Sequence, residues 1–226
     1  MCASYGLDPR FSDPEELLAD NEDLFDQLSA WSLANDGATL LPTGKNLRNL
    51  NPILVSQSGE RTLEHAWWGY LIDGAPANFP SINTRAERLR ERRETLPNRA
   101  LVPATRWFEM RKPQRTWYEF NSARDLFGMA AVTRPGRTAD GTRYTCYSLV
   151  MRPASQELSE VHNRVPLLIP GSFADDWLTS DLSAAELTQE AIAQSESALR
   201  RVTARSIDKR PQPRSTGNDA QGLKLF

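Results

Sequence analysis

The second residue of the chain is one of its two cysteines, and it directly follows the initiator methionine. Removal of Met1 would leave a free α-amine and a thiol on the same residue, Cys2. An α-amine has a pKa of about 8, so part of it is neutral at neutral pH and can attack an aldehyde to form a Schiff base. The thiol could then add to the imine carbon and close a thiazolidine ring. The alternative is a terminal thiol without a chemical task, because the first residues of a domain seldom contribute to packing.

Two other side chains could exchange protons with such a centre. Glu109 follows Trp107 and Phe108, and burial among such neighbours would raise the pKa of its carboxyl group and fit it for general acid–base catalysis. His162 is one of two histidines, and because its ordinary pKa lies near neutrality it could shuttle protons. Each also has a structural alternative: Glu109 as a satisfied carboxylate of the core or of a sheet edge, and His162 as part of a turn.

The other candidate ligands and nucleophiles do not form a recognisable pattern. Cys146 alternates with Tyr144 and Ser148 in a strand-like segment, which predicts a small buried apolar residue without a catalytic task. Two histidines and two scattered cysteines lack the spacing of metal ligands, and the chain has no glycine-rich phosphate loop. We therefore expect neither a metal site nor a cofactor.

The elements that must position these residues are predicted to be strands surrounded by helices. Turn residues bound segments rich in aromatic and β-branched residues, which predict strands over 49–59, 64–72, 99–110, 116–120, 126–134 and 143–151, the last two forming a hairpin. Helices are predicted over 12–35 with Asp13 as N-cap, over 82–96, over a short stretch of 155–169 ending near Pro166, and over 183–202 with a capping box of Ser183 and Glu186. Because strands cluster in the middle without strict alternation with helices, we expect an α+β fold built on antiparallel sheet.

Composition and charge narrow the function class. Hydrophobic residues make up 39% and charged residues 25% of 226 positions, which is typical of a soluble globular protein. We find neither a membrane span nor a signal peptide, so we expect a cytoplasmic protein without membrane partners. The net charge of −2 is unevenly distributed: residues 1–36 hold nine acids and one arginine, whereas residues 85–115 hold ten bases and four acids. The basic stretch permits an anionic partner, although a solvated helix face is the alternative for residues 85–96.

Four separated stretches together resemble the SOS-response-associated peptidase (SRAP) family. They are Cys2, the sequence NTRAE from Asn83, the sequence VPATRWFEM that contains Glu109, and the sequence EVHNRVPLLI that contains His162 and Arg164. The sequence HAWWGYLID also looks like the tryptophan–glycine stretch of that family. The resemblance extends from Cys2 to about Pro170. It implies antiparallel sheets forming a barrel-like core flanked by helices.

The resemblance also implies roles for individual residues. Cys2, Asn83, Glu109 and His162 would be catalytic, with Asn83 orienting the terminal amine by a hydrogen bond. Arg85 and Arg164 would bind DNA, Arg85 through a bidentate contact with a phosphate. Trp67 or Trp68 could stack on a base beside the lesion, with core packing as the alternative for at least one of them.

Four positions near the motifs depart from the family pattern. The family usually begins Met-Cys-Gly-Arg-Phe, whereas this chain has Ala3, Ser4 and Tyr5. The serine cannot neutralise a phosphate, so one phosphate contact of the family is missing. Met110 stands where the family often has tryptophan.

From this resemblance we expect a protein that crosslinks through Cys2 to abasic sites in single-stranded DNA, by a Schiff base and then a thiazolidine, and can reverse the link. An imine without the thiol would be prone to β-elimination, so lyase activity is the expected side reaction. The alternatives are an N-terminal cysteine hydrolase or autopeptidase acting on amide bonds and a non-catalytic module that binds single-stranded DNA. We further expect a monomer associated with the nucleoid, with a catalytic domain over residues 1–205 and a linker-like, mobile tail over 206–226.

Overall fold

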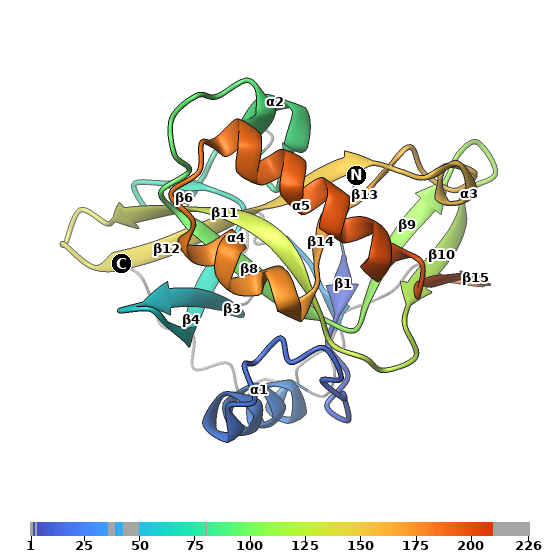
Figure 1. Cartoon of the computed structure of the whole chain (residues 1–226), viewed down its shortest axis with the longest axis horizontal. Helices are drawn as coiled ribbons and strands as arrows, with labels where there is room; N and C mark the ends of the chain where they lie inside the picture. The colour runs from blue at the N-terminus through green and yellow to red at the C-terminus, as the bar shows by residue number, and fades with distance from the viewer. Residues whose placement is uncertain (1, 3, 36–38, 43–49, 80, 210–226) are drawn as a thin grey trace.

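A closed barrel of five strands forms the centre of the molecule (Figure 1). The computed structural model describes residues 2, 4–35, 39–42, 50–79 and 81–209. In the barrel, β12 pairs with β4, β4 with β3, β3 with β8, β8 with β11, and β11 again with β12. All of these pairs are antiparallel except β4 with β12. The five strands are β3 (Leu50–Gln57), β4 (Glu60–Trp68), β8 (Arg99–Ala104), β11 (Phe127–Arg137) and β12 (Arg143–Pro153).

A second sheet of five strands continues directly from the barrel. Only Thr105 separates β8 from β9, so the chain passes from one sheet to the other without a loop. The sheet has the order β15-β10-β9-β1-β2. Its strands are β1 (Tyr5–Gly6), β2 (Thr39–Leu40), β9 (Arg106–Arg111), β10 (Thr116–Asn121) and β15 (Thr203–Ile207).

Short strands border the barrel. At one end of β12, β7 and β13 both pair with it, since Met151 lies opposite Arg85 on one strand and Pro166 on the other. The strand β14 pairs with β11, and β5 and β6 form a separate two-stranded ribbon. These strands are β5 (Leu71–Ile72), β6 (Ala75–Pro76), β7 (Asn83–Arg85), β13 (Arg164–Pro166) and β14 (Leu168–Ile169).

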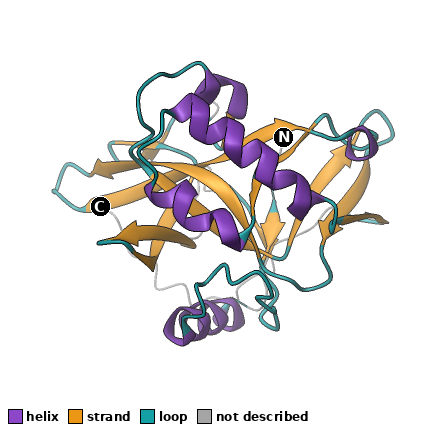
Figure 2. Cartoon of the chain, viewed as in Figure 1, coloured by secondary structure: helices purple, strands orange, loops and turns teal. Residues whose placement is uncertain are grey.

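The helices cover the outside of the barrel. In the view of Figure 1 and Figure 2, α5 and α4 cross in front of the sheets, α2 lies at the top and α1 lies at the bottom. The predicted capping box opens α5, where Ser183 and Glu186 bond to each other's backbone N–H groups. The helical elements are α1 (Glu22–Ala34), α2 (Ala86–Arg90), α3 (Gln156–Ser159), the 3₁₀ turn η2 (Gly171–Phe173), α4 (Ala174–Thr179) and α5 (Ala184–Leu199).

The core has two layers because side chains alternate between the inside and the outside of barrel strands. The inner layer takes residues from all five barrel strands and also contains Cys2 and Tyr5 from the N-terminal segment. The outer layer lies between the barrel and the helices, with Trp177 of α4 fully buried in it. The N-terminal cysteine therefore belongs to the inside of the barrel.

The prediction of one helix over 12–35 is wrong. Backbone φ angles are positive at Glu16, Ala19 and Asp20, so the chain cannot continue as a right-handed helix there. Asp13 instead caps a turn, and its carboxylate accepts hydrogen bonds from the backbone N–H groups of residues 17 and 18, each at 2.9 Å. The helix begins only at residue 22, with Asn21 as its N-cap.

Two other predicted helices are much shorter than expected. Residues 82–96 form β7 and then the five residues of α2, because the segment first pairs with β12. Within 155–169 the helix ends at Ser159, well before Pro166, which lies in β13. The α+β fold, the barrel-like core and the hairpin of β11 and β12 are confirmed.

The proposed boundary between residues 205 and 206 falls within β15, which pairs with β10 up to Ile207. The division into a domain and a tail stays a prediction, and residues 210–226 of that tail lie outside the described residues.

Candidate active site

The pairing of β1 with β9 brings the N-terminus to the predicted catalytic strand. Tyr5 lies opposite Trp107, and the backbone N–H of Phe108 donates to the carbonyl of Ser4 at 3.1 Å. Because the two strands are antiparallel, the chain from Ser4 back to Cys2 runs toward Glu109. Ser4 itself is buried, so the serine that replaces the family's arginine lies in the core.

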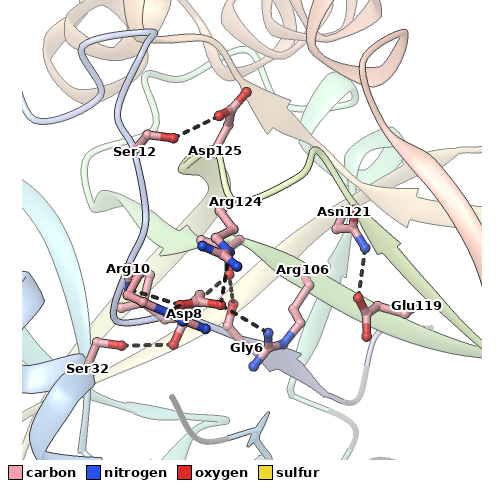
Figure 3. A network of polar contacts seen from close by, with 12 residues as sticks. Gly6, Asp8, Arg10, Ser12, Ser32, Arg106, Glu119, Asn121, Arg124 and Asp125 are labelled. Atoms are coloured by element: carbon pink, nitrogen blue, oxygen red, sulfur yellow. Dashed lines mark hydrogen bonds and ion pairs between the residues drawn. The ribbon is translucent and has the colours of Figure 1, made fainter. Parts of the chain in front are cut away.

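A polar network around Asp8 anchors the other end of β1 (Figure 3). The backbone N–H of Asp8 donates to Thr105 Oγ1 at 2.9 Å, and the Asp8 carboxylate accepts from the backbone N–H of Arg10 at 2.9 Å. The guanidinium groups of Arg106 and Arg124 lie 4.0 Å from the same carboxylate. Arg106 also lies on Gly6, where an added Cβ would be 2.6 Å from Arg106 Nε. These contacts fix the register of β1 and thereby the position of Cys2.

Cys2 is fully buried, and Asn83 holds it in place. The Asn83 side chain donates from Nδ2 to the Cys2 carbonyl at 2.8 Å, and the thiol of Cys2 donates weakly to the carbonyl of Ser4 at 3.5 Å. Burial raises the pKa of the Cys2 thiol, and the nearby Glu109 carboxylate raises it further. The thiol is therefore neutral at neutral pH and retains its proton.

Buried hydroxyl groups lie in the same part of the core as Cys2. Tyr5 and Tyr147 share a hydrogen bond of 2.7 Å between their hydroxyls, and Asn51 Nδ2 donates to the Tyr147 hydroxyl at 2.8 Å. The ring of Trp68 packs against both tyrosines, with centroid distances of 5.1 Å to Tyr5 and 6.3 Å to Tyr147. Sequence reasoning missed this network. The only available signal was Tyr5, three residues after Cys2.

Glu109 has the protonation behaviour that the sequence predicted. It lies on β9 and is 4% exposed. Burial raises the pKa of the carboxyl group to about 7. Its charged and neutral forms are therefore both well populated at neutral pH. A group that both donates and accepts protons during a reaction needs both forms.

His162 lies in the turn before β13 and is partly buried. Its Nδ1 accepts a hydrogen bond from the backbone N–H of Arg164 at 3.0 Å, so the neutral ring carries its proton on Nε2. Burial lowers the pKa of His162, and the charges of Lys112 and Arg164 act in the same direction. The ring is therefore mainly neutral at pH 7.

The predicted DNA-binding arginines lie on the two strands that flank β12. Arg85 on β7 is exposed. Arg164 on β13 donates from Nη1 to the Glu87 carboxylate at 2.7 Å, and this contact lowers the pKa of Glu87. Glu87 thus orients the side chain of Arg164, one of the predicted DNA-binding residues.

The two neighbouring tryptophans point to opposite sides of β4. Trp68 is fully buried in the inner layer and donates from Nε1 to the carbonyl of Ile82 at 2.9 Å. Core packing therefore accounts for Trp68, and the ring presents no surface on which a base could stack. Trp67 is 6% exposed and packs with Leu71 and Cys146 outside the barrel.

The structure thus brings Cys2, Asn83 and Glu109 together and places Arg85 and Arg164 beside β12. Over the described ranges, no group of three or more His, Cys, Asp or Glu residues could hold a metal ion. Within the same part of the chain, no helix is both long enough and apolar enough to cross a membrane.

Comparison with known proteins assigns the family. The family model described as SOS response associated peptidase (SRAP) matches residues 1–210. The chain belongs to the SRAP family. The family resemblance of the four sequence stretches is therefore confirmed.

One curated relative and three solved structures are similar to this chain. The chain is 27% identical over 187 residues to the abasic site processing protein YedK of Escherichia coli K12, across 77% of this chain and 79% of that protein. Two crystal structures of proteins from Bordetella bronchiseptica share the fold, with TM-scores of 0.61 and 0.62 at 16% and 18% identity. Each covers 92% of this chain, and the match includes 100% and 95% of those chains. A Bacteroides thetaiotaomicron protein has a TM-score of 0.57 at 18% identity, over 76% of this chain and 81% of its own.

Proposed function

We propose that this SRAP protein processes abasic sites in single-stranded DNA by linking to them covalently through Cys2 and later reversing the link. The observation that carries the proposal is the contact of Asn83 with Cys2 beside a Glu109 carboxyl whose pKa is about 7. The name of the relative YedK, an abasic site processing protein, supports the same substrate.

The first step is Schiff base formation. After removal of Met1, the Cys2 α-amine adds to the aldehyde of the opened abasic sugar and gives a carbinolamine. Protonated Glu109 donates a proton to the departing hydroxyl group, so water leaves and an imine forms. Its buried position keeps the carboxyl group partly protonated at neutral pH.

The second step is ring closure. The thiol sulfur of Cys2 adds to the imine carbon, and the thiol proton moves to the nitrogen, so a thiazolidine forms without oxidation or loss of atoms. Burial keeps this thiol neutral, so the group that closes the ring brings the required proton with it. The ring removes the imine that would otherwise lead to β-elimination and strand cleavage.

Reversal uses the same groups in the opposite direction. Glu109 as a carboxylate accepts the proton that it gave, and neutral His162 carries protons between the site and solvent through Nε2. The unpaired strand would contact exposed Arg85 and the guanidinium of Arg164 on either side of the lesion.

The test combines mass measurement with crosslinking. Intact mass should show a chain that begins at Cys2, and this chain should form a heat-stable adduct with a single strand that holds one abasic site. An intact strand and an abasic strand reduced with borohydride, which lacks the aldehyde, should give no adduct. Retention of Met1, or salt-sensitive binding without any adduct, would overturn the proposal. In the second case a non-catalytic DNA-binding module would be the better description, and hydrolysis of an amide substrate alone would favour the hydrolase.

A further inference from the structure

We propose that an exposed surface on the outside of the barrel binds the unpaired nucleotides that flank the lesion. We call it the hairpin surface, and it consists of His65, Tyr70, Arg134, Arg137, Arg143 and Tyr144. It involves none of the residues assigned above to the chemistry or to the lesion. The inference rests on the proposed function, because it supplies the path of the same DNA strand.

The hairpin surface contains a groove of about 650 Å³. His65 of β4 borders it on one side, and Arg137 and Arg143 border it from the hairpin of β11 and β12. Tyr144 lies flat against Gly136, where an added Cβ would be only 2.2 Å from a ring atom. The glycine thus lets an aromatic ring lie along the groove.

Tyr70 forms a second aromatic platform beside the groove. Its hydroxyl lies near those of Thr84 and Ser148, which are hydrogen-bonded to each other at 2.9 Å. The Arg134 guanidinium lies 5.9 Å from the centre of the Tyr70 ring. Aromatic faces next to guanidinium groups are the combination that binds single strands, because bases stack on the rings while arginines contact phosphates.

The charge of the surface favours a polyanion. Arg134, Arg137 and Arg143 are all exposed. The carboxylates nearby are occupied by local contacts: Glu64 accepts a hydrogen bond from Thr145, and Asp140 accepts from Thr138 and Thr142 within the hairpin turn. Three guanidinium groups therefore face two carboxylates, and the net charge of these groups is positive.

The hairpin surface begins next to the candidate active site. Thr84, whose hydroxyl lies near that of Tyr70, directly follows Asn83, which holds Cys2. Asn83 and Thr84 are consecutive residues of a strand, so their side chains point to opposite faces. From Ser148 to Arg143 the strand β12 covers roughly 17 Å, enough for a few nucleotides. A strand that leaves the site over β7 would thus reach Tyr70 first and the arginines afterwards.

The aromatic rings select unpaired nucleic acid over a duplex. Bases in a duplex stack on each other and cannot lie on Tyr70 or Tyr144, whereas bases of a single strand can. An acidic protein partner would use the arginines without the rings. Duplex DNA and protein partners are therefore alternatives that the experiment must separate.

The experiment measures equilibrium binding of Cys2→Ala protein to strands that carry a tetrahydrofuran analogue of the abasic site. One set of strands extends three nucleotides on each side of the analogue, and the other extends twelve. The test variant adds Arg134→Ala, Arg137→Ala and Arg143→Ala. The matched control adds Arg90→Ala, Arg92→Ala and Arg93→Ala, which removes the same charge from exposed arginines of another segment.

We expect the hairpin variant to weaken binding of the long strands at least tenfold and to leave the short strands within twofold. Removal of one arginine–phosphate interaction should reduce the slope of log affinity against log salt by about 0.7. Tyr70→Leu should also weaken long-strand binding, and a long duplex should not gain from the hairpin arginines.

Equal weakening by the hairpin and control variants, or equal weakening on short and long strands, would overturn the inference. A second measurement separates failure of this inference from failure of the proposed function. Cys2 is restored in each variant, and crosslinking to short abasic strands is measured. If crosslinking remains normal and the hairpin variant weakens short and long strands equally, only the inference about the hairpin surface is wrong. If no variant crosslinks, the proposed chemistry is wrong.

Discussion

One of the two buried cysteines, Cys2, packs in the inner layer of the core, and the other, Cys146, packs on the outside of the barrel. Both thiols are free, and burial raises the pKa of each. Cys2 lies inside the barrel at the chain terminus, with Asn83 bonded to its carbonyl and the Glu109 carboxyl nearby. Cys146 lies outside the barrel in mid-strand, where its sulfur accepts a weak hydrogen bond from the backbone N–H of Leu71 at 3.3 Å.

The comparison shows that thiol burial does not define the candidate active site. Burial raises the pKa of Cys146 to about 11, so at neutral pH almost none of this thiol is in the reactive thiolate form. The thiol of Cys2 is no more acidic, and what distinguishes Cys2 is the α-amine that Met1 removal would expose and the proton-exchanging neighbour. The reaction that we propose begins with the amine and uses the thiol second.

The largest expected effect is the difference in adduct formation between the single substitutions Cys2→Ala and Cys146→Ala. Cys2→Ala should abolish the stable adduct with abasic single strands, because an imine without the thiol cannot close a thiazolidine and is prone to β-elimination. Cys146→Ala should keep adduct formation within about twofold, since Cys146 packs with Trp67 and Leu71 on the outside of the barrel and its thiol makes one weak hydrogen bond, from the Leu71 backbone. Denaturing gels that quantify the adduct and the cleaved strand check both variants. A stable adduct from Cys2→Ala would contradict thiazolidine formation.

The Glu109 carboxyl should control release of the preformed adduct. Glu109→Gln should slow release by about a hundredfold to ten-thousandfold, the usual contribution of a general acid or base. Because reversal uses Glu109 as the carboxylate, wild-type release should also fall as the pH is lowered below 7, and the variant should lack this dependence. The measurement follows transfer of protein from a labelled to an unlabelled strand at several pH values.

Glu119 provides the matched control for Glu109. It lies on the adjacent strand β10, where its carboxylate bonds to Arg205 and Asn121. Glu119→Gln removes the same charge from the same sheet and should leave release unchanged. Equal slowing by both substitutions would show a general electrostatic effect, and wild-type release from Glu109→Gln would make Glu109 a structural residue.

Burial of Glu109 also predicts how stability depends on pH. Its pKa rises from 4.5 to about 7 in the folded protein, so between these values the folded state binds more protons than the unfolded state. The contribution of Glu109 to the free energy of unfolding therefore falls as pH rises through this window, by up to about 3 kcal/mol, and is constant above it. Urea unfolding at pH 5 and pH 8 should show this loss in the wild type and less of it in Glu109→Gln. The same pH dependence in both proteins would contradict the raised pKa.

The sequence predicted those features that depend on local patterns. The hairpin of β11 and β12 was predictable because turn formers join two apolar segments, and the start of α5 was predictable from Ser183 and Glu186. Burial of Glu109 followed from Trp107 and Phe108 immediately before it in a strand. The family motifs identified Cys2 and Asn83, whose contact the structure contains.

Features that depend on long-range pairing could not be predicted. Residues 82–85 have the composition of a helix start. Residues 83–85 nevertheless form a strand, because the edge of β12 is open there and they pair with it. Nothing in the sequence distinguishes Trp67 from Trp68, since only the barrel decides which face is inside. The hydrogen-bond network of Tyr5, Tyr147 and Asn51 joins three strands that are far apart in the sequence, so no pattern of residue spacing could predict it.

The smallest expected effect concerns Asn83, which positions Cys2 without taking part in bond formation. Asn83→Ala removes the hydrogen bond of 2.8 Å to the Cys2 carbonyl, a contact worth about 1 kcal/mol, so single-turnover crosslinking at saturating DNA should slow about fivefold. Its Oδ1 is also buried without a hydrogen-bond partner among the residues that the structure describes, so it is available to accept a hydrogen bond from the substrate or the amine. Thr84→Ala, at the next position of β7, is the control, because the Thr84 hydroxyl bonds to Ser148 on the other face and should not affect this rate. Equal rates for Asn83→Ala and the wild type would mean that the pairing of β1 with β9 alone positions Cys2, and the difference between the two cysteine environments would then reduce to Glu109 and the terminal amine.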